Sequence, residues 1–183
     1  MAQAIRQALR GSGAVVIRPR FALRGWNGDQ ASPVHDFSQI LAAVADQFAD
    51  VPVVLVGHSM GARAAMRVAG HPAVLAVAGL APWLPPGEPV EQLAGRWILL
   101  AHGNADRVTR PGDTWSFAER AESVTDVTSV EIRSGEHTML RRARLWHSIA
   151  AEFARLALKL PAGPGELDAV LGRTTGPSRH TVL

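Results

Sequence analysis

The feature that most constrains the fold is an alternation of short apolar runs with longer segments of helical periodicity. The runs are rich in β-branched residues and apolar nearly throughout, as strands buried on both faces of a parallel sheet are. Strands are predicted at Ala14–Arg18, Val51–Val56, Val74–Leu80, Arg96–Ala101 and Thr128–Arg133. Helices are predicted at Val34–Ala49, Met60–Gly70, Pro111–Ser123 and Leu140–Leu160. This order predicts an α/β protein, a three-layer α/β/α sandwich with a mostly parallel sheet.

The chain of 183 residues is long enough for one sizeable core, so one domain is expected, over residues 1–160. After Leu160 the composition shifts to Pro, Gly and small polar residues. Residues 161–183 are therefore predicted to form a flexible C-terminal tail. The proline-rich segment Pro82–Gly95 is predicted to be a loop that has room for a short helix at most.

Charge and composition argue against several classes of function. The net charge is only +3, and the isoelectric point near 10.8 follows from the lack of Cys and Tyr, so no nucleic-acid partner is expected. No apolar run reaches the roughly 20 residues of a membrane span, so no membrane partner is expected. With no secretory signal in the sequence, a cytoplasmic location is the expectation. The absence of Cys excludes thiol chemistry, and the lack of a close ligand pair predicts no metal site.

The segment Gly57-His58-Ser59-Met60-Gly61 directly follows one predicted strand and opens a predicted helix. At such a strand-to-helix turn the serine of a G-x-S-x-G pattern takes a strained conformation, and the glycines let neighbouring backbone approach closely. Ser59 is therefore the candidate nucleophile. The backbone N–H of Met60, at the helix N-terminus, is the candidate oxyanion donor. The alternative is that Ser59 only caps the helix.

Two further polar residues follow predicted strands at the same edge of the sheet. Asp106 lies in the turn after the strand Arg96–Ala101, and His137 lies in the loop after Thr128–Arg133. An imidazole there can take the serine proton near neutral pH, and a carboxylate can hold its other nitrogen. His137 is therefore the candidate base and Asp106 the candidate acid.

Other interpretations of these loops stay open. Asp106 is alternatively a loop aspartate that binds local backbone N–H groups. Asp113, at a helix start, and Asp126, at the opposite edge of the sheet, are weaker candidates for the acid. His102 is more readily explained as a buried turn histidine than as a catalytic one.

Three motifs together resemble those of α/β hydrolases, namely Val56-Gly57-His58-Ser59-Met60-Gly61, His102-Gly103-Asn104-Ala105-Asp106-Arg107-Val108 and Gly135-Glu136-His137. The candidate residues also occur in the chain order of that family, Ser, Asp, His. The turn Arg24-Gly25-Trp26-Asn27-Gly28 resembles its Arg-Gly-x-Gly turn, and the resemblance covers about Ala14–Leu158. It implies hydrolysis of an ester, thioester or amide without a cofactor.

The sequence departs from the family pattern near its start. Family members usually carry, before the region matching Ala14–Arg18, a strand ending in His-Gly whose loop supplies the second oxyanion N–H. This sequence has no such segment, and Met1–Gly11 resembles the helix that follows that loop. An N-terminally shortened fold with unpaired backbone beside Val51–Val56 and weak activity is therefore expected.

The short segment between Val74–Leu80 and Arg96–Ala101 stands where many family members insert a lid, so an open, lidless site is expected. Trp26 and Trp83 lie in loops at the active edge. They either line an apolar acyl pocket or cover core.

The function that these residues favour is that of a carboxylesterase-like serine hydrolase. It would act on a small-molecule substrate through an acyl-serine intermediate and use no cofactor. One alternative is a catalytically weak or silent hydrolase-fold protein that serves in binding or interaction, because a fold does not guarantee chemistry. The other is an acyltransferase that uses the same three residues. The sequence sets no expectation for the oligomeric state or the substrate's identity.

Overall fold

A parallel sheet lies at the centre of the computed structural model, which describes residues 1–48, 50–161, 167, 171 and 179–183. The sheet has five strands in the order β1-β2-β3-β4-β5, and each neighbouring pair is parallel. The strands are β1 (Val53–His58), β2 (Val74–Leu80), β3 (Trp97–Gly103), β4 (Asp126–Ile132) and β5 (Arg179–Val182). Neighbours in the sheet are also consecutive along the chain, as expected when crossover helices join parallel strands.

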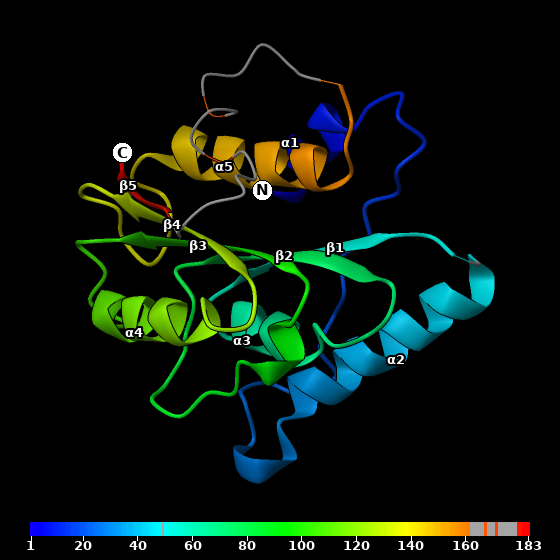
Figure 1. Ribbon diagram of the computed structural model, residues 1–183, viewed down its shortest axis with the longest axis horizontal. Coiled ribbons are helices and arrows are strands. Elements are labelled where there is room, and N and C mark those ends of the chain that lie inside the picture. Colours follow the sequence, from blue (N-terminus) through cyan, green and yellow to red (C-terminus); the bar gives the residue numbers. More distant parts are fainter. Residues whose placement is uncertain (49, 162–166, 168–170, 172–178) are drawn as a thin grey trace.

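Helices cover both faces of this sheet (Figure 1). The α-helices are α1 (Ala2–Ala8), α2 (Ser32–Gln47), α3 (Met60–Arg67), α4 (Pro111–Ala121) and α5 (Ala143–Ala157). Short 3-10 helices are η1 (Gly28–Gln30) and η2 (Glu91–Leu93). Helices α1 and α5 lie on one face, and α2, α3 and α4 lie on the other. The predicted three-layer α/β fold is therefore confirmed.

Strand β3 shows why its sequence is apolar from Trp97 to Ala101. Successive side chains of a strand point to opposite faces of the sheet. In β3, Ile98 and Leu100 join the core cluster that includes Phe37, whereas Leu99 and Ala101 join the cluster that includes Trp146. Both faces of the strand are therefore covered by helices, and its one polar side chain, His102 at the carboxyl end, is buried with hydrogen-bond partners.

The predicted strand Ala14–Arg18 is wrong. The segment is not part of the sheet, and two of its apolar side chains, Val15 and Ile17, are 72% and 51% exposed. A β-branched run forms a strand only where a neighbour accepts and donates its backbone hydrogen bonds. This segment has no such ladder in the described part of the chain, and β1 is an edge strand. Its sequence resembles a strand, but its surroundings do not allow one.

The C-terminal end also differs from expectation. Of the segment 161–183, expected to be a flexible tail, residues Arg179–Val182 form strand β5. This strand pairs with β4 in parallel, from Thr128 opposite Arg179 to Glu131 opposite Val182. The pairing satisfies backbone groups along an edge of β4 that would otherwise be open. Most of the rest, at 162–166, 168–170 and 172–178, lies outside the described residues.

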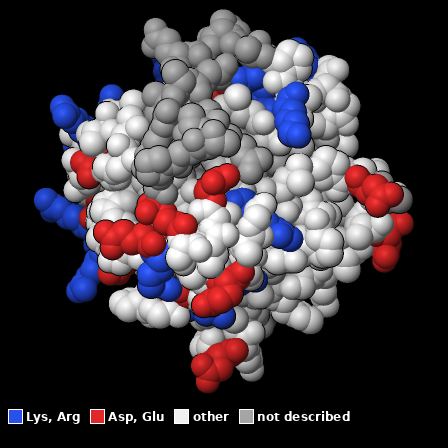
Figure 2. All heavy atoms as spheres, in the orientation of Figure 1, with Lys and Arg blue, Asp and Glu red and all other residues white. Residues whose placement is uncertain are grey.

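The outer surface carries charges of both signs. On the face drawn in Figure 2, acidic and basic side chains are interspersed, with broad uncharged areas between them. Within the described ranges, no helix has the length and apolar character needed to cross a membrane.

The last residue of β3 and the loop that follows β4 touch through two glycines, which yields a stability prediction. A Cβ added at Gly103 would lie 2.2 Å from the carbonyl oxygen of Gly135, so backbone would have to move. We expect Gly103→Ala to lower the free energy of unfolding by at least about 2 kcal/mol. Urea unfolding followed by tryptophan fluorescence measures this change.

The matched control is Gly112→Ala in α4, where an added Cβ meets no atom within 4 Å. It should leave the free energy of unfolding unchanged or raise it by up to about 1 kcal/mol, since alanine is the better helix former. Equal effects of the two substitutions would contradict the close approach of Gly103 to Gly135.

Candidate functional site

Ser59 lies at the turn between β1 and α3. Its backbone has φ 52° and ψ −122°, a sparsely populated conformation for a residue with a side chain. Gly57 makes this turn possible, because a Cβ there would lie 2.5 Å from the Cα of Ala62. The expectation for Gly61 was wrong, because an added Cβ at Gly61 meets nothing within 4 Å. One glycine of the motif therefore serves the close approach.

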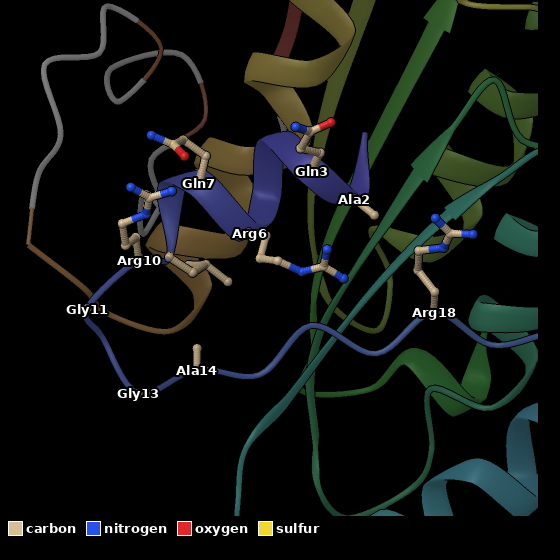
Figure 3. Close-up of a pocket in the computed structure, with 10 residues that line it drawn as sticks. Ala2, Gln3, Arg6, Gln7, Arg10, Gly11, Gly13, Ala14 and Arg18 are labelled. Atoms are coloured by element: carbon tan, nitrogen blue, oxygen red, sulfur yellow. The ribbon is translucent and has the colours of Figure 1, made fainter.

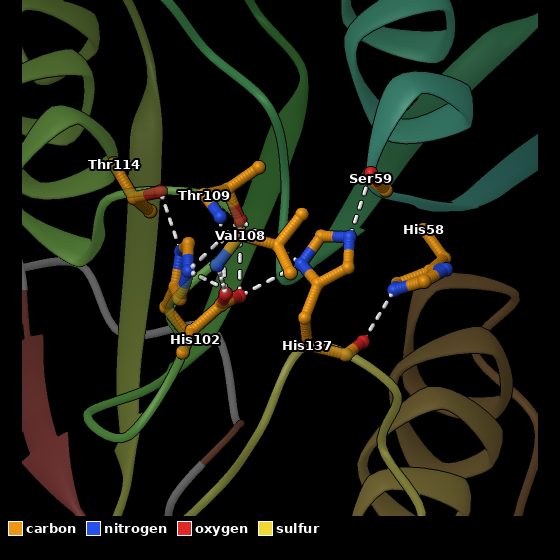
Figure 4. Close-up of polar contacts among 8 residues, drawn as sticks. His58, Ser59, His102, Val108, Thr109, Thr114 and His137 are labelled. Carbon is orange, nitrogen blue, oxygen red and sulfur yellow. Dashed lines mark hydrogen bonds and ion pairs between the residues drawn. The ribbon is translucent and has the colours of Figure 1, made fainter.

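Three of the predicted residues form a hydrogen-bonded line across the carboxyl ends of the strands (Figure 4). His137 Nε2 is 2.9 Å from Ser59 Oγ, and His137 Nδ1 is 2.8 Å from Asp106 Oδ2. Because an ionised carboxylate only accepts, Nδ1 carries the proton in this arrangement. Nε2 is then free to accept the hydroxyl proton of Ser59. The order of donors matches that of a serine–histidine–aspartate triad.

Both oxygens of the Asp106 carboxylate accept hydrogen bonds. Oδ1 accepts from the N–H groups of Val108 at 2.8 Å and Thr109 at 3.0 Å. Oδ2 accepts from the Thr109 hydroxyl at 2.9 Å, from His102 Nε2 at 3.1 Å and from His137. Burial alone would raise the pKa of Asp106, but the hydrogen bonds from Thr109, Val108 and His137 lower it to about 2. Asp106 therefore binds local backbone and His137 at once.

His102 is the inner neighbour of Asp106. It is fully buried at the end of β3, and its Nδ1 is 2.7 Å from Thr114 Oγ1. Burial lowers the pKa of His102 more than Asp106 raises it, which favours the neutral ring. Its Nε2–H donates to Asp106, so Nδ1 must accept from the threonine hydroxyl. The residue is thus a buried histidine, as expected, and also a direct partner of the carboxylate.

Sequence reasoning assigned no role to His58. Its Nε2–H donates to the backbone carbonyl of His137 at 2.8 Å, and the two rings lie 4.9 Å apart. Burial, the largest effect, lowers the pKa of His58 despite the hydrogen bond to that carbonyl. His58 therefore fixes the backbone of the loop that carries His137. The sequence did hold a signal for a role at the site, because His58 is the variable residue just before Ser59 in the G-x-S-x-G motif.

Thr109 was missed as well. Its hydroxyl donates to Asp106 Oδ2 and lies 3.1 Å from His137 Nδ1, so it touches both members of the pair. A threonine three residues after an aspartate in a turn is a common local arrangement, and nothing in its spacing identifies a contact with a distant histidine.

The other predicted positions lie around Ser59. Met60 is the first residue of α3, where a backbone N–H has no acceptor within its own helix. The N–H of Trp83 donates to the Ser59 carbonyl at 3.2 Å, and its side chain is 36% exposed. The Trp26 ring packs edge-to-face on Trp83 at 5.8 Å and also touches the core cluster that includes Phe37. The two tryptophans are thus partners beside the serine.

A separate hollow of about 700 Å³ lies between α1 and the segment 11–18 (Figure 3). Its lining includes Arg6, Arg10 and Arg18, and none of the residues above belongs to it. In the part of the chain that the structure describes, no group of three or more His, Asp or Glu side chains could hold a metal ion.

Comparison with known protein families shows which family the chain belongs to. A model of the alpha/beta hydrolase family matches residues 3–178. The chain belongs to this family. Family membership suggests a hydrolase, and it is consistent with the sheet, the turn at Ser59 and the chain order of the three residues. No curated protein has a significant sequence match to the chain.

Solved structures of alpha/beta hydrolases share the fold. The esterase domain of a Rhodothermus marinus protein superposes with a TM-score of 0.65 at 20% identity, over 84% of this chain and 79% of that one. A Bacillus cereus carboxylesterase gives 0.56 at 20% identity, over 80% of each chain. A serine hydrolase without a lid from Xanthomonas campestris gives 0.63 at 20% identity, over 88% of this chain and 74% of that one.

The low pKa of Asp106 predicts how the stability of this family member depends on pH. An unfolded aspartate has a pKa near ~3.9. In the folded chain the value is about 2, so the ionised group stabilises the fold by about 2 kcal/mol above about pH 5. That contribution is lost as the pH falls through 4 towards 2. Asp106→Asn should therefore be less stable than the wild type at pH 7, and the difference should shrink on acidification.

Urea unfolding at pH 7, 5, 3.5 and 2.5 measures the difference. The control is Asp46→Asn, an exposed position on α2, which should differ from the wild type by less than about 0.5 kcal/mol throughout. A difference for Asp106→Asn that stays constant down to pH 2.5 would show that the folded carboxylate has no lowered pKa.

Proposed function

We propose that the chain is a carboxylesterase-like serine hydrolase that cleaves a small ester, thioester or amide through an acyl-serine intermediate. The observation that carries the proposal is the line Ser59–His137–Asp106, with contacts of 2.9 and 2.8 Å. The tryptophans Trp26 and Trp83 would line the acyl pocket.

In the first half of the reaction, Ser59 Oγ attacks the carbonyl carbon of the substrate while His137 Nε2 takes the hydroxyl proton. The N–H of Met60 donates to the oxygen on which negative charge develops. The tetrahedral intermediate then collapses, and His137 returns the proton to the departing alcohol, thiol or amine. Asp106, with a pKa of about 2, stays ionised and stabilises the imidazolium.

In the second half, His137 removes a proton from water, and the hydroxide attacks the acyl-serine carbonyl. Collapse breaks the bond to Ser59 Oγ, which recovers its proton from His137 and releases a carboxylic acid. An alcohol in place of water would give acyl transfer by the same steps. Product analysis with water and an alcohol in competition separates the two reactions.

The oxyanion contacts set the expected rate. The described residues identify one donor, the N–H of Met60, and removal of one donor typically costs 100- to 1000-fold in kcat. Turnover is therefore expected to be slow, while formation of a covalent adduct at Ser59 should persist. This single donor is also what favours the second candidate, a hydrolase-fold protein that binds ligands without turnover.

The first test is labelling with a fluorophosphonate, which phosphonylates an activated serine and releases fluoride. The wild type should gain one adduct by intact mass, mapped to Ser59. Ser59→Ala should gain none, and His137→Ala should react at least about 1000-fold more slowly. Ser116→Ala, an exposed position on α4, is the control and should react like the wild type.

The wild type should also hydrolyse phenyl hexanoate, followed by phenol release. A folded wild type that gains no adduct and releases no phenol would contradict the proposed function and leave the binding protein as the better candidate. An adduct at a serine other than Ser59 would refute the assignment of the nucleophile.

A further inference from the structure

A buried arginine lies beside the candidate nucleophile. Arg63 is on α3, one helical turn after Ser59, and is only 9% exposed. Its backbone N–H donates to the Ser59 carbonyl at 3.3 Å, and the N–H of Trp83 donates to the same oxygen at 3.2 Å. Arg63 and Trp83 are thus fixed to the turn that carries the nucleophile.

The contacts of the Arg63 guanidinium involve its ring-stacked faces and its Nε. The guanidinium carbon lies 3.9 Å from the centre of the Trp26 ring and 4.5 Å from that of Trp83. Its Nε donates to Glu88 Oε2 at 2.7 Å. The two terminal nitrogens have no hydrogen-bond partner within the described residues. The two tryptophan rings therefore contact the faces of the guanidinium and Glu88 binds its Nε, while the terminal N–H groups have no acceptor among the described residues.

The charges around Arg63 do not balance. Glu88 is 2% exposed, and its carboxylate is shared between Arg63 and Arg67. Arg120 adds a third guanidinium, whose Nη1 donates to the backbone carbonyl of Glu88 at 2.7 Å. Burial lowers the pKa of Arg63 by more than Glu88 raises it, so the positive charge is incompletely compensated. A buried guanidinium whose charge is incompletely compensated favours the binding of a second anion.

We propose that the terminal N–H groups of Arg63 bind a carboxylate on the acyl part of the substrate, so that the site selects monoesters or monothioesters of short dicarboxylic acids. The inference rests on the proposed function. Two terminal nitrogens of a planar guanidinium match the two oxygens of a carboxylate, which a neutral acyl chain does not offer. Trp26 and Trp83 would hold the methylene chain between that carboxylate and Ser59.

The test compares two esters that differ in one terminal group, monophenyl adipate and phenyl hexanoate. The wild type should give a kcat/KM for the adipate at least about 10-fold above that for the hexanoate. Arg63→Met should lower this ratio at least about 10-fold, and Arg63→Lys should lower it less, because a lysine keeps the charge but not the fork. Free adipate should inhibit phenyl hexanoate hydrolysis by the wild type competitively, which requires no variant.

The matched control is Arg67→Met, which also removes a partner of Glu88 but no contact with either tryptophan ring. Its ratio should stay within about twofold of the wild type, and thermal melts confirm that each variant is folded. If the wild type cleaves both esters equally, or if Arg63→Met lowers both alike, the inference is wrong and the proposed function stands. Failure of labelling and of both hydrolyses overturns the function and the inference together.

Discussion

The candidate site depends on the parallel pairing of β1 to β4. Parallel strands place all their carboxyl ends at one edge of the sheet. The register aligns these ends, with His58 opposite Leu80 and Gly103 opposite Ile132. Ser59 follows β1, Asp106 follows β3 and His137 follows β4, so the three side chains meet although 78 residues separate the serine from the histidine. Any slip of one strand would separate the base from its partners.

Much of this arrangement is predictable from the sequence, because each step is local. A buried parallel strand has an apolar sequence, and the helix after it has a 3.6-residue period. Strand β2 was predicted at its observed bounds, and other element ends differ by a few residues. A polar residue just beyond such a strand must then lie at the shared edge. Ser59, Asp106 and His137 therefore come together in the structure as their positions along the chain predict.

The remaining features depend on partners that the sequence does not identify. Ala14–Arg18 has the residues of a strand but lacks a neighbouring ladder among the described residues, whereas Arg179–Val182 has a weak pattern and a neighbour in β4. The contacts of His58 and Thr109 with His137 arise only when separate loops are folded against each other. Local pattern specifies which residues suit a strand or a turn. Whether these residues form a strand or a turn depends on which segment of the chain packs beside them.

The conformation of Ser59 depends both on the local sequence of the turn and on contacts from a distant segment. A residue with a side chain at φ 52° and ψ −122° costs of order 1–3 kcal/mol, which the surroundings must offset. Its carbonyl oxygen accepts N–H groups from Ala62, Arg63 and Trp83 at 3.1, 3.3 and 3.2 Å. The first two come from the helix, and the third comes from the loop after β2. The backbone that holds the candidate nucleophile is therefore also the backbone that positions Arg63 and Trp83, so the geometry of the turn and the placement of these two residues are set together.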